Sequence, residues 1–367
     1  MAFDHIASAV GDHLGQIVDH ARSVGTQRGD RNQLFHDFFL QQAAILSSNR
    51  LRCRVRRARQ LARRACPIAW KIKGIRMECA GSLVAVVTPM EADGEIDWMA
   101  WDALIDWHLS EGTNGIVVVG TTGESPTVTL EESVELVAKA VERVAGRIPV
   151  IAGAGTHATA SSIERARVLS EAGADALLMV TPYYNKPPQA GLIKHFLSVA
   201  DAVSTPIILY NVPGRTGVDM LPKTVAEIAA HPRVVAIKEA VAGAERVRDI
   251  LALAPGFTVL SGDDPTFVDA MHAGARGVIS VTANVAPAPM QSIAAAALQG
   301  DWETARRLDA SLAELHQGLF VEPNPIPAKA ALKMMGKIEG GVRLPLVELS
   351  AAAEAPLRQI LKAAGVL

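Results

Sequence analysis

The stretches PIILYNV at residues 206–212 and VVAIKEA at residues 234–240 decide the fold class. Both are short apolar runs, rich in Val and Ile, with polar residues near their ends. Runs of this kind are typical of parallel strands that are covered on both faces. Six more runs of the same character complete the series: LVAVVTP (83–89), GIVVVG (115–120), PVIAGAG (149–155), ALLMVTP (176–182), FTVLSGDD (257–264) and GVISVTA (277–283). The chain therefore contains eight candidate strands.

Segments with helical periodicity lie between these runs. The apolar side chains of segment 130–144 recur on one face: Val134, Val137, Ala138 and Val141. Thr129 precedes this segment as a predicted N-cap, and two glutamates follow in the first turn. Segments 97–109 and 163–171 have similar spacing, so we expect a helix in each.

Eight strand–helix units across about 200 residues predict a (β/α)8 barrel. A doubly wound sheet is the competing architecture, but it usually carries a Gly-rich phosphate loop after its first strand, and Thr88-Pro89-Met90 is not such a loop. We expect the barrel to span residues 77–300 and a C-terminal helical segment to span residues 301–367. Helical patterns after the eighth run cover residues 290–298, 302–320 and 326–335.

The composition excludes several classes of protein. Of the 367 residues, 49% are hydrophobic, which is enough for a large core, yet no run approaches the roughly 18 apolar residues of a transmembrane helix. The three cysteines lie within the first 79 residues: Cys53, Cys66 and Cys79. A disulfide framework, a cysteine nucleophile and a cysteine-ligated zinc site are therefore not expected in the rest of the chain. The histidines are scattered without metal-ligand spacing.

Charge is distributed unevenly. Residues 1–76 hold 12 Arg and 2 Lys against 5 Asp, a net +9, whereas the remainder holds 22 basic and 33 acidic residues, a net −11. The acidic body argues against sequence-independent nucleic-acid binding. The Arg-rich stretch 50–64 has three interpretations: a nucleic-acid or anionic-lipid arm, a transit peptide, or a segment outside the functional protein. We favour the third, with Met77 as the natural start, and expect some helix near residues 33–45.

Function in a (β/α)8 barrel lies at the C-terminal ends of the strands, and Lys238 stands near the end of the sixth run. By alternation, Val234, Ala236 and Lys238 share one face, which points Lys238 into the barrel. A lysine withdrawn from water can act as an amine nucleophile toward carbonyls. The alternative is an ion-paired structural lysine.

Other strand ends carry further candidates. Tyr210, in the fifth run, could transfer protons, and Arg215 after it could bind a substrate carboxylate; core packing and a solvated charge are the alternatives. The glycines, hydroxyls and N–H groups of GTTGES (120–125) suit an anion. Asp263 and Asp264 lack a third ligand, so we do not predict a metal site there.

These groups together describe a Schiff-base enzyme that acts on an α-keto acid. The GTTGES segment would hold the carboxylate, Lys238 would attack the ketone, and Tyr210 would move protons during the imine and enamine steps. The protonated imine is itself the electron sink, so we expect neither a metal nor an organic cofactor.

The same residues also resemble a known family. GTTGES (120–125) and six further motifs look like those of the 4-hydroxy-tetrahydrodipicolinate synthase (dihydrodipicolinate synthase) family, in order from Gly81 to the C-terminus. The six are TPYYN (181–185), YNVPGRTG (210–217), IKEA (237–240), SGDD (261–264), GVISVTANVAP (277–287) and VEPNPIPAK (321–329). The resemblance implies that pyruvate condenses with L-aspartate-4-semialdehyde in the diaminopimelate route to lysine. It also implies a cytoplasmic homotetramer, a dimer of dimers, without nucleic-acid or membrane partners.

The resemblance implies a role for each site residue. Lys238 corresponds to the Schiff-base lysine and Tyr210 to the proton donor and acceptor. Thr121 and Tyr184 correspond to the rest of the proton relay, with the tyrosine reaching in from a neighbouring subunit. The substrate-binding positions are Thr122 and Ile279 for pyruvate, Gly262, and Arg215 for the carboxylate of the semialdehyde.

One departure from the family pattern concerns feedback inhibition. Members that are inhibited by lysine bind it at a subunit interface through polar side chains, and four of these are replaced here, by Leu130, Ser133, His157 and Ser161. Tyr183 and Ser125 of that site remain. Loss of the carboxylate partner of the lysine ammonium costs a few kcal/mol. We therefore expect weak or absent inhibition by lysine.

Two other functions remain open at this point. A sister aldolase, such as N-acetylneuraminate lyase or a keto-deoxy-sugar-acid aldolase, would share the lysine, the tyrosine and the pyruvate chemistry, and Arg215 in YNVPGRTG is the discriminating residue. A non-catalytic homologue would be expected to lose Lys238, Tyr210 or Tyr184, and all three are present.

Overall fold

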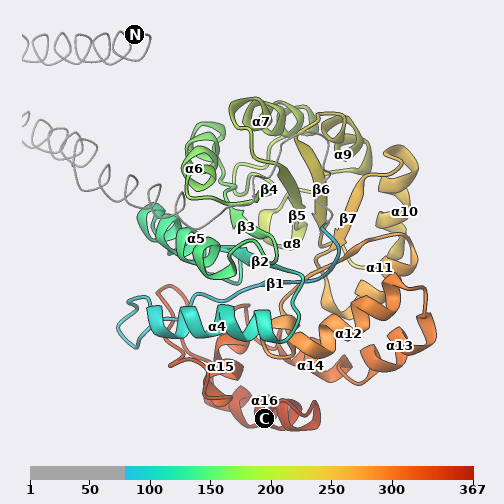
Figure 1. Ribbon diagram of the computed structural model, residues 1–367. Coiled ribbons are helices and arrows are strands. Elements are labelled where there is room, and N and C mark those ends of the chain that lie inside the picture. The colour runs from blue at the N-terminus through green and yellow to red at the C-terminus, as the bar shows by residue number, and fades with distance from the viewer. Residues whose placement is uncertain (1–78) are drawn as a thin grey trace, which may run out of the picture. The chain divides into compact units, whose positions relative to one another are not determined.

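The computed structural model describes residues 79–367. In this range eight parallel strands pair in chain order and close into a barrel, with β1 beside β8 (Figure 1). The strands are β1 Gly81–Ala85, β2 Gly115–Val118, β3 Val150–Gly153, β4 Ala176–Val180, β5 Ile207–Asn211, β6 Val234–Glu239, β7 Thr258–Ser261 and β8 Gly277–Ser280. The predicted (β/α)8 architecture is therefore confirmed. A doubly wound sheet is excluded because an open sheet has no pairing between its first and last strands.

Each strand is followed by at least one helix, and the helices surround the strands (Figure 1). The helices that follow β1 to β8 are α4 Trp98–Ser110, α5 Leu130–Val144, α6 Thr159–Glu171, α7 Gln189–Ala202, α8 Pro213–Thr216 with α9 Pro222–Ala229, α10 Ala244–Leu253, α11 Phe267–His272 and α12 Pro287–Leu298. Two short 3-10 turns, η1 Asp264–Thr266 and η2 Thr282–Asn284, precede α11 and α12.

The apolar side chains form two cores. One fills the barrel and includes Leu83, Val117, Ile208 and Ile279. The other lies between the strands and the surrounding helices, and it takes the alternate strand residues, such as Ile116 and Val118 of β2. Because both faces of the sheet are covered, the strands read as continuous apolar runs rather than as alternating ones.

Strand β6 departs from simple alternation. Ile207 pairs with Val234, but Ile208 pairs with Ala236, so Val235 is an extra residue in β6. The prediction that Val234 shares a face with Ala236 is wrong: Val234 lies in the outer core, whereas Val235 and Ala236 belong to the barrel interior. A bulge of this kind redirects the side chains that follow it. It leaves Ile237 facing the helices and Lys238 level with Tyr210.

Helix α5 begins and ends where its periodicity indicates. Thr129 caps it, accepting from the Glu132 amide through its side chain, while the Glu132 side chain accepts from the Thr129 amide at 2.8 Å. This reciprocal pair is a capping box. The buried face is rotated from the predicted one and consists of Ser133, Leu136, Val137, Ala140 and Val144. The rotation matters below because it buries Ser133.

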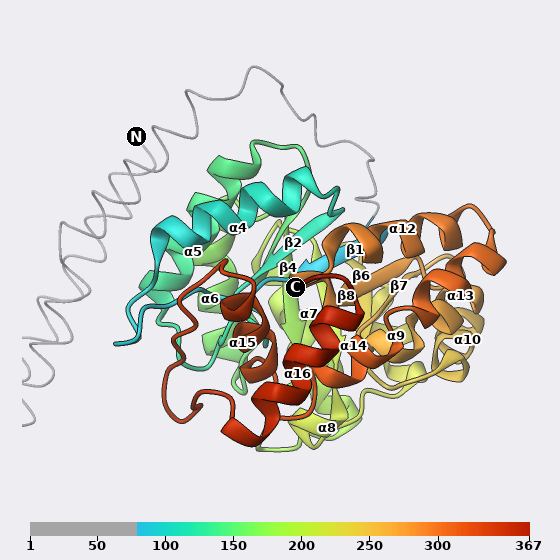
Figure 2. The same cartoon turned by 90° about the horizontal axis from the view of Figure 1, so that it is seen from below.

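Four more helices follow the barrel in the chain. They are α13 Trp302–Ala310, α14 Ala313–Gly318, α15 Ile326–Met334 and α16 Ala351–Ala363 (Figure 2). The predicted single helix over residues 302–320 is two helices, because the chain breaks at Ser311 and Leu312. Helix α16 packs against both α14 and α15, so these three helices form one group.

The expectations for residues 1–76, including the Arg-rich stretch, the helix near residues 33–45 and a start at Met77, lie outside the described residues. Within residues 79–367, no helix is long and apolar enough to cross a membrane. The same range contains no cluster of three or more His, Cys, Asp or Glu side chains that could hold a metal ion.

Candidate active site

Lys238 stands at the carboxyl end of β6 and points into the barrel. Its interior neighbour two residues earlier, Ala236, belongs to the barrel core, and Lys238 itself is only 5% exposed. The Lys238 Nζ lies 4.6 Å from the centre of the Tyr210 ring, and the two residues are register partners across β5 and β6. The barrel thus brings the predicted nucleophile and the predicted proton carrier together.

Gly262, directly after β7, provides room for the lysine. A Cβ atom at this position would lie 2.9 Å from Lys238 Cε and 2.9 Å from Ala240 Cβ. The Gly262 amide also donates to the Glu239 carbonyl at 2.7 Å, which holds the loop close to β6. A side chain here would therefore push Lys238 or the loop out of place.

Two lysines are buried in the described part of the chain, and they have opposite surroundings. Lys329 on α15 donates to the Glu124 carboxylate, and both side chains are within 1% of complete burial. Lys238 has no hydrogen bond or ion pair to its Nζ among residues 79–367. No carboxylate competes for the Lys238 amine, so it is available to form a bond to a substrate carbonyl carbon.

The GTTGES loop is held in a strained conformation at the end of β2. Val119 has φ 53° and Glu124 has φ 57°, in the left-handed region that a β-branched residue such as Val rarely adopts. Gly153 permits this fold, because a Cβ there would lie 2.0 Å from the Val119 carbonyl oxygen. Strain of this kind persists only where surrounding contacts fix it. The loop leaves Thr121 half-buried and Thr122 buried.

Asn324 joins two of the predicted substrate residues. Its Nδ2 donates to Thr122 Oγ1 at 3.0 Å, and its carbonyl accepts from Arg215 Nη2 at 3.2 Å. Arg215 is otherwise exposed, at the end of the short helix α8. Neither Asn324 nor Lys329 has a predicted role beyond its place in the VEPNPIPAK motif. The position of Lys329 among the apolar residues of a predicted helix indicates that its charge is buried.

Ile279 lies on β8 inside the barrel, opposite Leu83 of β1. The end of β8 is fixed by Asp264, whose Oδ2 accepts from the amides of Val281 and Thr282 at 2.9 and 3.0 Å. Asp263 accepts instead from the Thr266 hydroxyl at 2.6 Å. These two acids therefore accept hydrogen bonds from the local backbone and from a turn hydroxyl.

Tyr184 differs from the other predicted catalytic residues in its exposure to solvent. Its side chain is 93% exposed, and its backbone is left-handed with φ 71°. The neighbouring Tyr183 packs edge-on against the His157 ring at 5.4 Å between centres.

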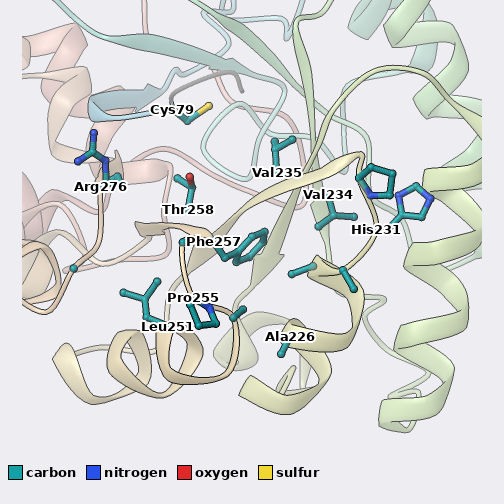
Figure 3. A pocket seen from close by; sticks show the side chains of 16 residues that line it. Cys79, Ala226, His231, Val234, Val235, Leu251, Pro255, Phe257, Thr258 and Arg276 are labelled. Carbon is teal, nitrogen blue, oxygen red and sulfur yellow. The ribbon is translucent and has the colours of Figure 1, made fainter. Parts of the chain in front are cut away.

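A cavity of about 310 Å³ opens beside these groups. Thr121 and Tyr210 line one part of it, and Tyr183 and Arg165 line another. A larger cavity, of about 810 Å³, lies at the other end of the barrel, where β6 and β7 begin (Figure 3). Cys79 lines that second cavity, and burial raises the pKa of its thiol to about 11, so it is a poor nucleophile at neutral pH.

Glu239, next to Lys238 but on the outer face of β6, is a buried carboxyl with an unusual charge state. Burial raises its pKa from 4.5 to about 7, although the Val241 amide and Asn211 Nδ2 donate to it at 2.8 and 3.0 Å. The folded chain therefore keeps this proton between about pH 4.5 and 7, while the unfolded chain releases it. Stability from this group is complete below about pH 4.5 and is lost as pH rises through 7.

We expect Glu239→Gln to remove this pH dependence. Between about pH 5 and 8 the free energy of unfolding of the unmodified protein should fall by an amount of up to about 3 kcal/mol that the variant does not lose. Chemical denaturation at several pH values, with the two proteins at equal concentration, measures the difference. Parallel pH profiles for the two proteins would contradict the assignment.

The fold and the placing of these side chains define a (β/α)8-barrel enzyme whose polar groups gather at the carboxyl ends of the strands. Residues 78–364 match the model of the Dihydrodipicolinate synthetase family, and the chain belongs to that family.

Relatives and solved structures agree with this membership. The chain is 54% identical over 289 residues to the 4-hydroxy-tetrahydrodipicolinate synthase of Pseudomonas savastanoi pv. phaseolicola, covering 78% of this chain and 99% of the relative. It is similar to the chloride-inhibited dihydrodipicolinate synthase of Acinetobacter baumannii in complex with pyruvate, with a TM-score of 0.78 and 46% identity over 78% of this chain and 99% of that one. The enzyme of Cyanidioschyzon merolae with lysine bound matches with a TM-score of 0.76 and 39% identity, over 78% and 99% of the two chains.

Proposed function

We infer that the chain is a 4-hydroxy-tetrahydrodipicolinate synthase, a lyase of lysine biosynthesis through diaminopimelate, and we propose that Lys238 is the amine that binds its first substrate, pyruvate. The observation that carries this proposal is the pair of buried lysines. Lys329 is neutralised by Glu124, whereas Lys238 has no ionic partner in the described residues and faces the Tyr210 ring. Family membership and relatives of the same activity support the reaction.

In the first step, Lys238 Nζ forms a bond to the ketone carbon of pyruvate, and the carbonyl oxygen leaves as water. Thr122 is suited to hold the pyruvate carboxylate. Its Oγ1 already accepts from Asn324, so its own O–H is free to donate to an anion. Tyr210, beside the lysine, supplies and removes the protons that imine formation requires.

In the second step, the methyl carbon of the imine loses a proton and becomes an enamine. That carbon forms a bond to the aldehyde carbon of L-aspartate-4-semialdehyde, whose oxygen takes a proton. The amino group of the semialdehyde then attacks the imine carbon, closes the ring and releases Lys238. Arg215, exposed at the barrel mouth and tied to Asn324, is placed to hold the semialdehyde carboxylate.

The proton relay of this proposal includes Thr121, Tyr210 and Tyr184. Because Tyr184 is almost fully exposed in one protomer, we propose that it acts in the site of a second copy, within a homotetramer. Ile279 and Gly262 complete the pyruvate site from β8 and β7, the first through its backbone and the second by leaving space for the lysine.

The test is an assay of the purified chain with pyruvate and L-aspartate-4-semialdehyde, coupled to the downstream reductase, together with borohydride trapping. Turnover, and a pyruvate adduct that peptide mapping places on Lys238, support the proposal. An adduct without turnover would point to a sister aldolase with a different aldehyde partner. Absence of both would point to a non-catalytic homologue.

We further propose that lysine inhibits this enzyme weakly or not at all. Leu130 lines the cavity beside the site, and Ser133 is buried, with its Oγ 3.3 Å from Arg165 Nη2. A guanidinium at this place repels the ammonium groups of lysine. The expected result is little loss of activity at millimolar lysine. Half-inhibition well below millimolar lysine in the coupled assay would show this proposal to be wrong.

A further inference from the structure

Arg215 is carried by a short loop, residues 212–218, that is closed at its base. The chain leaves β5 after Asn211, forms the short helix α8, and returns at Asp219 and Met220. The Asn211 side chain holds the two ends together, because its Nδ2 donates to Asp219 Oδ1 at 2.8 Å and its Oδ1 accepts from the Met220 amide at 2.9 Å. We call residues 212–218 the Arg215 loop.

Contacts within the Arg215 loop do little to fix the direction of its arginine. The Arg215 side chain is exposed, and its guanidinium donates to the Asn324 carbonyl at 3.2 Å. Helix α8 has only four residues, which is about one turn and too short to be stable on its own. The Thr216 hydroxyl, which donates to the Val218 carbonyl at 2.9 Å, closes the turn but does not contact the arginine side chain. The direction of Arg215 therefore depends on what holds the base of the loop.

Asp219, at that base, is held by two helices that lie on either side of α9 (Figure 1). From α10, Arg246 Nη2 donates to Asp219 Oδ2 at 2.7 Å and Nη1 donates to Oδ1 at 3.2 Å, which makes a bidentate pair. From α7, Gln189 Nε2 donates to the Asp219 carbonyl at 2.8 Å. The side chains of Arg246 and Asp219 are 16% and 32% exposed, so solvent screens this pair only in part.

We propose that Asp219 is a positioning residue for the second substrate: it fixes the base of the Arg215 loop and so aims Arg215 at the carboxylate of L-aspartate-4-semialdehyde. This inference rests on the proposed function, in which Arg215 holds that carboxylate. A guanidinium binds a carboxylate well only when its two N–H groups are correctly oriented, so a displacement of about 1 Å weakens the contact strongly. Arg246 acts through Asp219 in the same way.

The pyruvate half of the site has a separate support. Asn211 Nδ2 also lies 3.0 and 3.1 Å from the two carboxylate oxygens of Glu239, and this contact joins the end of β5 to the end of β6. Asn211 and Glu239 directly follow Tyr210 and Lys238, which are register partners. The contact does not involve Asp219. Loss of the Asp219 side chain should therefore weaken binding of the second substrate and leave imine formation with pyruvate intact.

Steady-state kinetics of Asp219→Ala in the coupled assay test this split. We expect the KM for the semialdehyde to rise at least about tenfold, because a charge-assisted contact is weakened. The KM for pyruvate and the rate of borohydride trapping at Lys238 should stay within about twofold of the unmodified chain. The matched control is Asp106→Ala, which breaks the bidentate pair of Asp106 on α4 with Arg143 on α5 and should change none of the three quantities.

An unchanged KM for the semialdehyde in Asp219→Ala would overturn the proposal. A similar rise in the KM for both substrates would also overturn it, because general damage to the barrel mouth would then be the cause. Arg246→Leu breaks the same pair from α10 and should reproduce the selective rise. It provides the test if Asp219→Ala does not fold.

A double variant shows whether Asp219 acts through Arg215. A positioning residue has nothing left to position once its target is gone, so the two effects are not additive. We expect Arg215→Leu to raise the KM for the semialdehyde more than Asp219→Ala does, and the double variant to match Arg215→Leu within about twofold. A further rise of about tenfold in the double variant would mean that Asp219 acts independently, and the proposal would fail.

The unmodified chain separates this inference from the proposed function. Absence of turnover in the unmodified chain would remove the proposed function and this inference with it. Turnover of the unmodified chain, together with an unchanged semialdehyde KM in Asp219→Ala and Arg246→Leu, would overturn the positioning role alone.

Discussion

Replacing Lys238 with alanine is expected to reduce kcat by a factor on the order of 10⁴ to 10⁶, because removal of the nucleophile from a covalent mechanism leaves only binding and electrostatic effects. Borohydride trapping with pyruvate should give no adduct in the same variant. The fold should survive, because the Nζ has no ion pair or hydrogen bond to lose among the described residues. Kinetics in the coupled assay and a thermal unfolding midpoint on one preparation measure both effects.

Lys238→Arg distinguishes a nucleophile from a charge. Arginine keeps the positive charge and much of the length, but its guanidinium stays protonated and cannot form the imine. We expect Lys238→Arg to be as inactive as Lys238→Ala. Activity within about tenfold of the unmodified enzyme, in either variant, would contradict the Schiff-base role of this residue.

Replacing Lys329 with alanine, unlike replacing Lys238, is expected to destabilise the fold. The expected loss in the free energy of unfolding is about 3–5 kcal/mol, because the Glu124 carboxylate is left buried without its cation. Lys329 is completely buried and Glu124 is 1% exposed, so water cannot replace the lost partner. The remaining contact that approaches the Glu124 carboxylate is the Arg343 amide, which donates at 3.1 Å. Chemical denaturation at matched protein concentration measures the change.

A double variant separates the lost pair from the lost packing. Lys329→Met with Glu124→Gln removes both charges and keeps most of the volume, and replacing a buried ion pair with neutral groups is often tolerated. This double variant should recover most of the stability that Lys329→Ala loses. If Lys329→Ala is as stable as the unmodified chain, or if the double variant is as unstable as Lys329→Ala, the ion pair is not the cause.

The fold was predictable because its signal is local and repeated. Eight runs rich in Val and Ile, at regular intervals, need a sheet with two covered faces, and closure of β1 on β8 provides it. Each run predicts its strand without reference to distant residues. The position of Lys238 near a strand end could be read in the same way.

Alternation along the sequence could not predict which face of the sheet every residue of β6 occupies. Counting from Val234 places Ala236 and Lys238 correctly but puts Val234 on the wrong face, because Val235 is an extra residue in the pairing with β5. A bulge depends on how two strands fit together, and the sequence of one strand does not contain that information. The conclusion about Lys238 holds because the bulge lies before Ala236.

The supports of the site were missed for a different reason. The partners Asn324 and Thr122 are 202 residues apart, and Lys329 and Glu124 are 205 residues apart. Arg165 and Ser133 lie on separate helices and belong to no motif. Charge pairing over such separations follows from the three-dimensional fold, whereas periodicity describes only neighbours along the chain. The contacts of Tyr184 are harder still to predict from periodicity, because its proposed partner belongs to a second copy of the chain.

The GTTGES loop contacts residues that are translated much later: Thr122 accepts from Asn324, and Glu124 accepts from Lys329. At a synthesis rate of about 5–20 residues per second, roughly 10 to 40 s separate the appearance of Glu124 from that of Lys329. During that time the loop that presents Thr121 and Thr122 lacks the contacts that fix it. A chain cut short before residue 324 lacks both of these contacts, and we expect it to be inactive.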